Sequence, residues 1–294
     1  MDPRDGNYGD PMTNPHSAGG EAPGFTMPAN ACDCHMHVFD SSLPFAANAV
    51  LTHEAATVEQ YRSLQRRLGS TRNVVVQPSS YGTDHRAMLA ALAQFGDAAR
   101  GVAVVTPETP DAELEELAAS GVVAARLNLV QRGATDVAMA RPLASRLRRL
   151  GWHLQVHMKP EDFLNEVDML LALDIDVVVD HFARVFCDRE LAPLMERSVL
   201  KLLASGHGWL KLSGAYMAVP SGSHDLGELD NFVAAVKELH TSRLIWGTDW
   251  PHATEVEKPN DATLANLLAT WFPEATTRQS ILTTNPARLY GFRD

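Results

Sequence analysis

The sequence has 294 residues, of which 45% are apolar and 21% are charged, and its formal net charge is −11. This composition is that of an ordinary globular protein, and the negative charge argues against binding to nucleic acid or to an anionic membrane surface. No apolar run approaches the roughly 18 residues that a membrane-spanning helix needs. The length allows two domains or one large α/β barrel.

The first 30 residues differ in composition from the rest of the chain. They are polar and rich in Gly and Pro, without the basic start and apolar core of a signal peptide. These features predict an N-terminal arm on a cytoplasmic protein. Phe25 and Met27 are the expected anchors, at the bottom of the following domain or on a neighbouring subunit and away from the active site. The three cysteines of the chain fit a reduced compartment.

Eight apolar, β-rich runs follow the arm. They are Cys32–Phe39, Asn73–Gln77, Gly101–Val105, Val123–Leu129, His153–His157, Ile175–His181, Trp209–Ser213 and Leu244–Thr248. Segments with helical spacing lie between and after them, namely Val58–Leu68, Asp84–Phe95, Asp111–Ala119, Ala138–Leu150, Glu161–Leu173, Glu190–Ala204, Asp225–His240, Asp261–Trp271 and Thr276–Thr283. This alternation predicts a parallel sheet, and eight such units predict a single-domain, distorted TIM (β/α)8 barrel over residues 31–294.

Two histidines end the first run. If this run is a strand, His35 and His37 point to the same face, where two imidazoles can hold a metal ion or polarise a carbonyl group. The same alternation puts Cys32 and Cys34 on the opposite face, as small packing residues.

Polar side chains follow most of the other predicted strands. They are Gln77, Ser79, Ser80 and Tyr81; Arg126, Asn128 and Arg132; His157; His181 and Arg184; Ser213 and Tyr216; and Asp249, Trp250 and His252. Active sites of (β/α)8 barrels lie at the carboxyl ends of the strands, so this pattern predicts an enzyme.

Several of these segments resemble motifs of a known family. They are Asp33–Phe39, Gln77–Asp84, Val179–His181, Ile245–His252 and Asn285–Tyr290. Together they resemble the second amidohydrolase family, whose fold is a distorted (β/α)8 barrel. The resemblance is strongest to its lactonase subgroup, which includes 2-pyrone-4,6-dicarboxylate lactonases, sulfomuconolactone hydrolases and galactarolactone isomerases.

The resemblance implies a catalytic centre of His35, His37, His181 and Asp249, with Asp249 as the base that activates water. The same four residues are the implied ligands of one divalent metal ion, with zinc the expected metal. The segment Arg126–Asn128 lacks the carboxylated lysine of binuclear members, and several lactonases of the subgroup work without a metal. Metal-independent catalysis, with the carbonyl group polarised by the histidines, is therefore an open alternative.

A second group of residues is expected to bind the substrate. It consists of Arg126, Arg132, Arg184, Ser79, Tyr81, His157, Tyr216 and His252. Arginine suits the recognition of a carboxylate or sulfonate group. The predicted function is the hydrolysis of a small carboxylated or sulfonated lactone in aromatic or sugar-acid catabolism. Alternatives are a lactone isomerase and a metal-dependent decarboxylase, and both a monomer and a homo-oligomer are compatible with the sequence.

Overall fold

The computed structural model describes residues 14–131, 134–223 and 225–293. Eight parallel strands form one sheet in the order β1 to β8. Their bounds are Cys32–Met36, Arg72–Val76, Ala99–Ala103, Val122–Asn128, His153–His157, Val177–Val179, Gly208–Leu212 and Leu244–Trp246. The predicted (β/α)8 barrel is confirmed, with each strand within a few residues of its predicted run.

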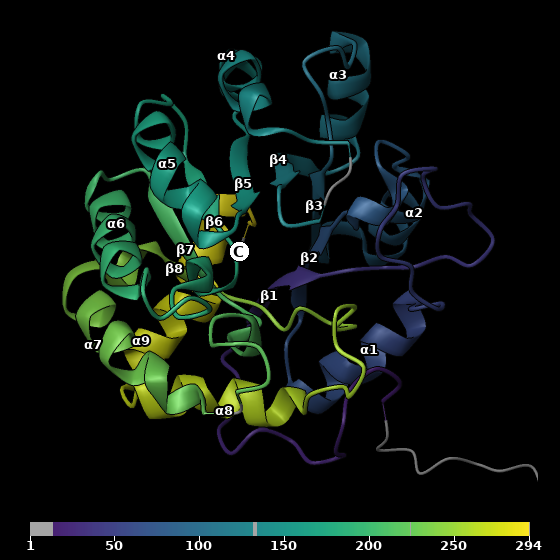
Figure 1. The fold of residues 1–294 in the computed structure, drawn as a ribbon. Coiled ribbons are helices and arrows are strands. Elements are labelled where there is room, and N and C mark those ends of the chain that lie inside the picture. The colour runs from purple at the N-terminus through teal and green to yellow at the C-terminus, as the bar shows by residue number, and fades with distance from the viewer. Residues whose placement is uncertain (1–13, 132–133, 224, 294) are drawn as a thin grey trace, which may run out of the picture.

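Helices surround the strands, as Figure 1 shows. The helices α1 to α10 span Val58–Leu68, Arg86–Phe95, Asp111–Ala119, Ala140–Leu150, Pro160–Leu171, Ala192–Ala204, Leu229–His240, Asp261–Trp271, Ala275–Gln279 and Asn285–Tyr290. The helix α10, which follows a π-helical turn at Ser280–Thr284, is not among the predicted helices. Within the described ranges, no helix has both the length and the apolarity to span a membrane.

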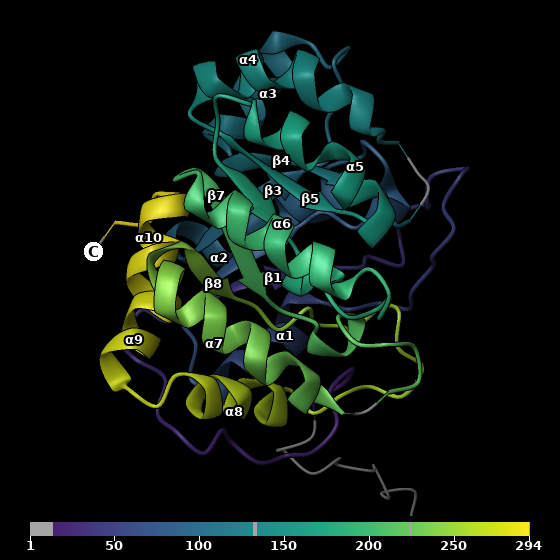
Figure 2. The ribbon, with the colours of Figure 1, turned by 60° about the vertical axis from the view of Figure 1, so that its left-hand side comes forward.

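The inside of the barrel holds a small apolar cluster at its lower end. Its members are Cys32, Cys34, Val74, Val76, Val102, Ala124, Val178, Trp209, Ile245, Tyr290 and Phe292. Tyr290 packs on His153 and Phe292 lies under Arg72, the first residues of β5 and β2. The C-terminal segment therefore closes the amino-terminal end of the barrel, and Figure 2 shows α10 at that end.

The predicted orientation of the two cysteines is wrong. Cys32 and Cys34 pack inside the barrel, on the same side as the ring of His35, which contacts Lys211 and Asp180 inside the barrel. The pairing of β1 with β2 shifts register between Asp33 and Met36, so strict alternation does not hold across this segment.

Asp33 closes the barrel between β8 and β1. Its carboxylate accepts hydrogen bonds from the backbone N–H groups of His35 and Thr248, at 3.0 and 2.9 Å, and from the hydroxyls of Thr248 and Tyr61. Beyond it, the N–H of Asp249 donates to the carbonyl of His35 at 2.8 Å. This closure places the loop after β8 directly beside the histidines of β1.

The described part of the N-terminal segment passes closer to the catalytic end than expected. Met27 is buried and Phe25 stacks under Arg278, but a further contact lies at Trp250. The indole N–H of Trp250 donates to the side chain of Asn14 and to the carbonyl of Pro15, at 3.3 and 3.1 Å. The expectation that this segment stays away from the active-site end is therefore wrong.

Candidate active site

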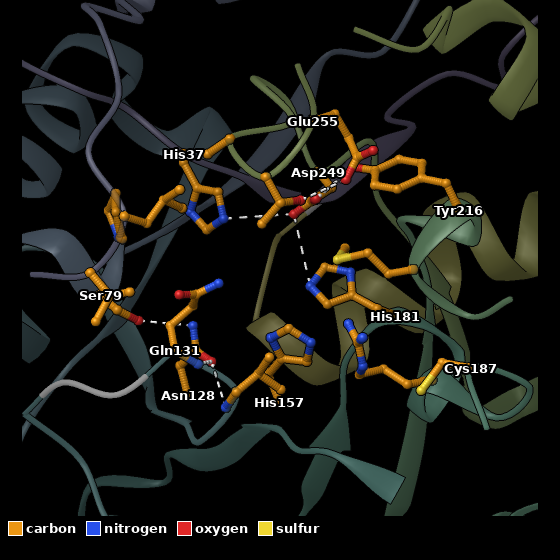
Figure 3. Close-up of a pocket in the computed structure, with 18 of the residues that line it drawn as sticks. His37, Ser79, Asn128, Gln131, His157, His181, Cys187, Tyr216, Asp249 and Glu255 are labelled. Atoms are coloured by element: carbon orange, nitrogen blue, oxygen red, sulfur yellow. Dashed lines mark hydrogen bonds and ion pairs between the residues drawn. The ribbon is translucent and has the colours of Figure 1, made fainter. Parts of the chain in front are cut away.

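A pocket with a cavity volume of about 440 Å³ opens at the carboxyl ends of the strands. Side chains from seven of the eight strand ends or their loops line it, including His37, Ser79, Arg126, Asn128, His157, His181, Arg184, Tyr216 and Asp249. Figure 3 shows His37 and His181 on either side of Asp249, with His157 beside His181.

Three imidazoles surround the carboxylate of Asp249. The Nε2 atoms of His35, His37 and His181 lie 3.5, 3.7 and 3.8 Å from Asp249 Oδ1. The predicted centre of three histidines and one aspartate is therefore present as a spatial cluster.

Two strained backbone segments hold this cluster. Asp249 has φ of 68°, and the four residues His181–Arg184 have φ between 53° and 55°. Side chains with a Cβ atom rarely adopt this left-handed region, at a cost of about 1–2 kcal/mol each. Buried Phe182, which packs on Trp271, and the hydrogen-bonded Asp249 backbone offset that cost. Such strain concentrates at functional sites.

Burial decides the charge states in the cluster. It lowers the pKa of His35, His157 and His181, so these rings are neutral near pH 7. Burial alone would raise the pKa of Asp249, but the neighbouring imidazoles of His181, His37 and His35 hold it below its ordinary value. Asp249 is therefore an ionised carboxylate that faces mainly neutral rings.

The spacing of His35, His37 and Asp249 fits a metal ion, and His181 lies beside this group. Donor atoms of a tetrahedral zinc site, each about 2.0–2.2 Å from the metal, lie about 3.3–3.6 Å from one another. The distances from Asp249 Oδ1 to the imidazole nitrogens come close to this range, and His35 Nε2 is buried without a hydrogen-bond partner among the described residues. The ligand atoms of His35, His37 and Asp249 all lie within 4.8 Å of one another.

A chain of hydrogen bonds runs from Asp249 into the protein. The hydroxyl of Tyr216 donates to Asp249 Oδ2 at 2.8 Å and lies 2.9 Å from His252 Nδ1. His252 Nε2 lies 3.1 Å from Asp261 Oδ2, and both residues are fully buried. His252 thus lies behind Tyr216 and does not line the pocket.

Two arginines supply positive charge to the pocket. Arg126 is buried on β4, where its Nη1 donates to the carbonyl of Gln77 and its Nε lies 3.7 Å from Asp180. Arg184 lies at the end of the left-handed turn, and its Nε is buried without a partner among the described residues. Nearby, the amide of Asn128 donates to Ser79.

Not every predicted substrate-binding residue reaches the pocket. Tyr81 does not line it, because its hydroxyl bonds to the backbone of Asp40 instead. Arg132 lies outside the described residues. Conversely, Lys211 is not among the predicted site residues, but it is fully buried inside the barrel beside His35 and Asp180. A lysine within an apolar strand run was the available signal, because such a charge needs a buried partner.

Comparisons with known proteins agree with this architecture. A family model described as Amidohydrolase matches residues 32–292. A 2-pyrone-4,6-dicarboxylate hydrolase of Comamonas testosteroni is 34% identical over 281 residues, covering 91% of this chain and 92% of the relative. A 4-sulfomuconolactone hydrolase of Rhizobium radiobacter is 30% identical, with 91% and 92% covered. A D-galactarolactone isomerase of Agrobacterium fabrum is 28% identical, with 92% and 94% covered.

Solved structures give the same result for the fold. An apo crystal structure from Agrobacterium tumefaciens superposes with a TM-score of 0.85 at 27% identity, covering 95% of this chain and 99% of the other. A zinc-bound amidohydrolase of Burkholderia multivorans, at 19% identity and a TM-score of 0.72, shares the fold.

Proposed function

The chain belongs to the amidohydrolase family, and from that premise we propose that it hydrolyses a small anionic lactone. The observation that carries the proposal is the ionised carboxylate of Asp249, which faces three imidazoles at the floor of a pocket that also holds two arginines. Ester hydrolysis needs a base for water and donors for the oxyanion, and we assign these roles to Asp249 and to the imidazoles.

In the proposed reaction, Asp249 accepts a proton from a water molecule as the water oxygen bonds to the lactone carbonyl carbon. The imidazole cluster polarises the carbonyl oxygen. The ring C–O bond then breaks, and its electron pair goes to the ring oxygen, which takes up a proton. The product is an open chain that carries a hydroxyl group and a carboxylic acid. This acid is ionised at neutral pH and releases its proton.

Other side chains of the pocket bind and orient. Tyr216 fixes the carboxylate of Asp249 by donating to its second oxygen. Arg184 and Arg126 are the candidate partners for a carboxylate or sulfonate group of the substrate. His157 and Ser79 line the wall of the pocket between these groups.

With the Nε2 of His35 deprotonated, His35, His37, His181 and Asp249 would hold a divalent metal ion in this site. When bound, such an ion would act as a Lewis acid toward the carbonyl oxygen and lower the pKa of water.

A panel of carboxylated and sulfonated lactones, followed with a pH indicator in weak buffer, tests the proposal. Hydrolysis releases one proton per turnover, whereas decarboxylation releases carbon dioxide. Lactone isomerisation is a second candidate, because the isomerase relative is 28% identical to this chain, and it releases neither. If none of the lactones in the panel releases a proton when the enzyme is added, the proposal is contradicted.

A further inference from the structure

A lysine lies at the centre of the barrel, directly beneath the proposed catalytic cluster. Lys211, on β7, is 0% exposed. Its Nζ donates to Gln155 Oε1 at 2.7 Å, lies 3.1 Å from Asp180 Oδ1 and lies 3.2 Å from His35 Nδ1. An ammonium group has three N–H donors and no acceptor, so in its contact with Lys211 the Nδ1 of His35 has to accept.

The neighbours of Lys211 are themselves fixed. The amide nitrogen of Gln155 donates to Asp180 Oδ2 at 2.9 Å, which leaves Gln155 Oε1 facing the lysine. Asp180 carries the balancing negative charge and is also 0% exposed. The third N–H of Lys211 therefore points to the ring of His35.

A ring nitrogen that accepts a hydrogen bond carries a lone pair, so the proton of a neutral imidazole lies on the other nitrogen. In His35 that other nitrogen is Nε2, which faces Asp249 Oδ1 at 3.5 Å. His37 shows the opposite arrangement. Its Nδ1 has to donate to the carbonyl of Val76, at 2.7 Å, so a neutral His37 presents its Nε2 lone pair to the site.

We propose that Lys211 is a positioning residue that keeps the proton of His35 on Nε2, so that His35 offers the site an N–H donor and not a metal-ligating lone pair. The proposal rests on the proposed function only in taking this cluster as the reaction site. It divides the roles of the two histidines of β1: His35 donates toward the oxyanion or Asp249, whereas His37 presents a lone pair.

A competing arrangement is available inside the same network. Asp180 Oδ1 lies 3.4 Å from His35 Nδ1 and would accept a hydrogen bond from an Nδ1–H group if Lys211 were absent. The carboxylate would then orient His35 with its Nε2 lone pair toward the site, as in carboxylate–histidine–metal arrangements. Lys211 therefore selects between a hydrogen-bonding and a metal-ligating form of His35.

Nitrogen-15 NMR of histidine-labelled wild-type protein without substrate tests the proton position directly. Comparison with His35→Gln assigns the ring. We expect the chemical shift of Nδ1 to be that of an unprotonated nitrogen, and Nε2 to show a one-bond coupling to hydrogen. A proton on Nδ1 would overturn the proposal, whether or not the protein hydrolyses any lactone.

Zinc titration by calorimetry provides the second readout. Lys211→Met should bind zinc at least about tenfold more tightly than the wild type. The hydrogen-bond partner of the second ring nitrogen of a metal-ligating histidine changes metal affinity by about 10–100-fold. Lys201→Met is the matched control, because Lys201 is exposed and pairs with Asp168 on the surface, and its zinc affinity should equal that of the wild type.

Removal of Lys211 leaves the Asp180 carboxylate buried without its cation, and an unpaired buried charge destabilises the folded protein. If Lys211→Met does not fold, the double variant Lys211→Met/Asp180→Asn removes both charges and keeps an acceptor for His35 Nδ1. Equal zinc affinity in the folded variant and the wild type would overturn the proposal.

Discussion

The hydroxyl of Tyr216 donates a 2.8 Å hydrogen bond to Asp249 Oδ2, which leaves Oδ1 to face the three imidazoles. This bond ties the loop after β7 to the loop after β8 and fixes the orientation of the proposed base.

Tyr216→Phe tests this bond. A hydrogen bond to a charged group contributes about 1.5–3 kcal/mol, so we expect kcat to fall by about 10–100-fold with a smaller change in KM. Steady-state kinetics on a lactone substrate measures this effect. Tyr81→Phe is the matched control, because its hydroxyl bonds to the Asp40 backbone outside the pocket. Unchanged kcat in Tyr216→Phe would show that Asp249 is oriented without it.

Asp249→Asn should abolish turnover while the barrel stays folded. Loss of a general base costs about 10²–10⁴-fold in rate. Rate measurements with circular dichroism as the folding control test this expectation, and Asp84→Asn, in an outer ion pair with Arg86, is a comparison variant. A folded Asp249→Asn enzyme with near-normal kcat would rule Asp249 out as the base.

Arg184→Met should raise KM by about 10-fold or more and leave kcat nearly unchanged. The guanidinium lines the pocket with a buried Nε that has no partner among the described residues, so an anionic substrate is its expected partner. Arg86→Met, at an exposed ion pair, is the control for removing an arginine. An unaltered KM would assign Arg184 to holding the left-handed turn.

Deletion of residues 1–18 should destabilise the protein by about 1–3 kcal/mol, the cost of leaving a buried donor without an acceptor. The donor is the indole N–H of Trp250, which loses Asn14 and Pro15. Because Trp250 follows Asp249, we also expect kcat to fall. Urea denaturation and kinetics measure both effects, and deletion of residues 1–13, which keeps Asn14 and Pro15, is the comparison. Equal stability of the two truncations would disprove a role for this contact.

Asp33 predicts a pH dependence of stability. Burial raises its pKa to about 6, above the value of about 3.9 for an exposed aspartate. The folded state therefore binds this proton more tightly than the unfolded chain, and the contribution of Asp33 to the free energy of unfolding falls as the pH rises from about 4 through about 6. The difference in unfolding free energy between the wild type and Asp33→Asn should decrease over that window. A constant difference would be evidence against the raised pKa.

The sequence by itself determined the barrel and the members of its central cluster. Alternating runs of period 2 and 3.6 specify parallel strands with helices between them, and strand ends in such a barrel have to meet at one face. The sequence alone therefore groups His35, His37, His181 and Asp249, although they come from three distant parts of the chain.

Only the tertiary structure decided which groups touch within and behind that cluster. The register shift in β1 put Cys34 and His35 on the same side, and no periodicity predicts where a ladder slips. The hydroxyl of Tyr81 bonds to Asp40 while Tyr216 reaches Asp249, since loop conformation and not strand order aims these side chains. The contact of Lys211 with His35 joins residues 176 positions apart. Hydrogen bonds of this kind form or fail with differences of a few tenths of an ångström in the donor–acceptor distance. Packing of the whole barrel sets those distances.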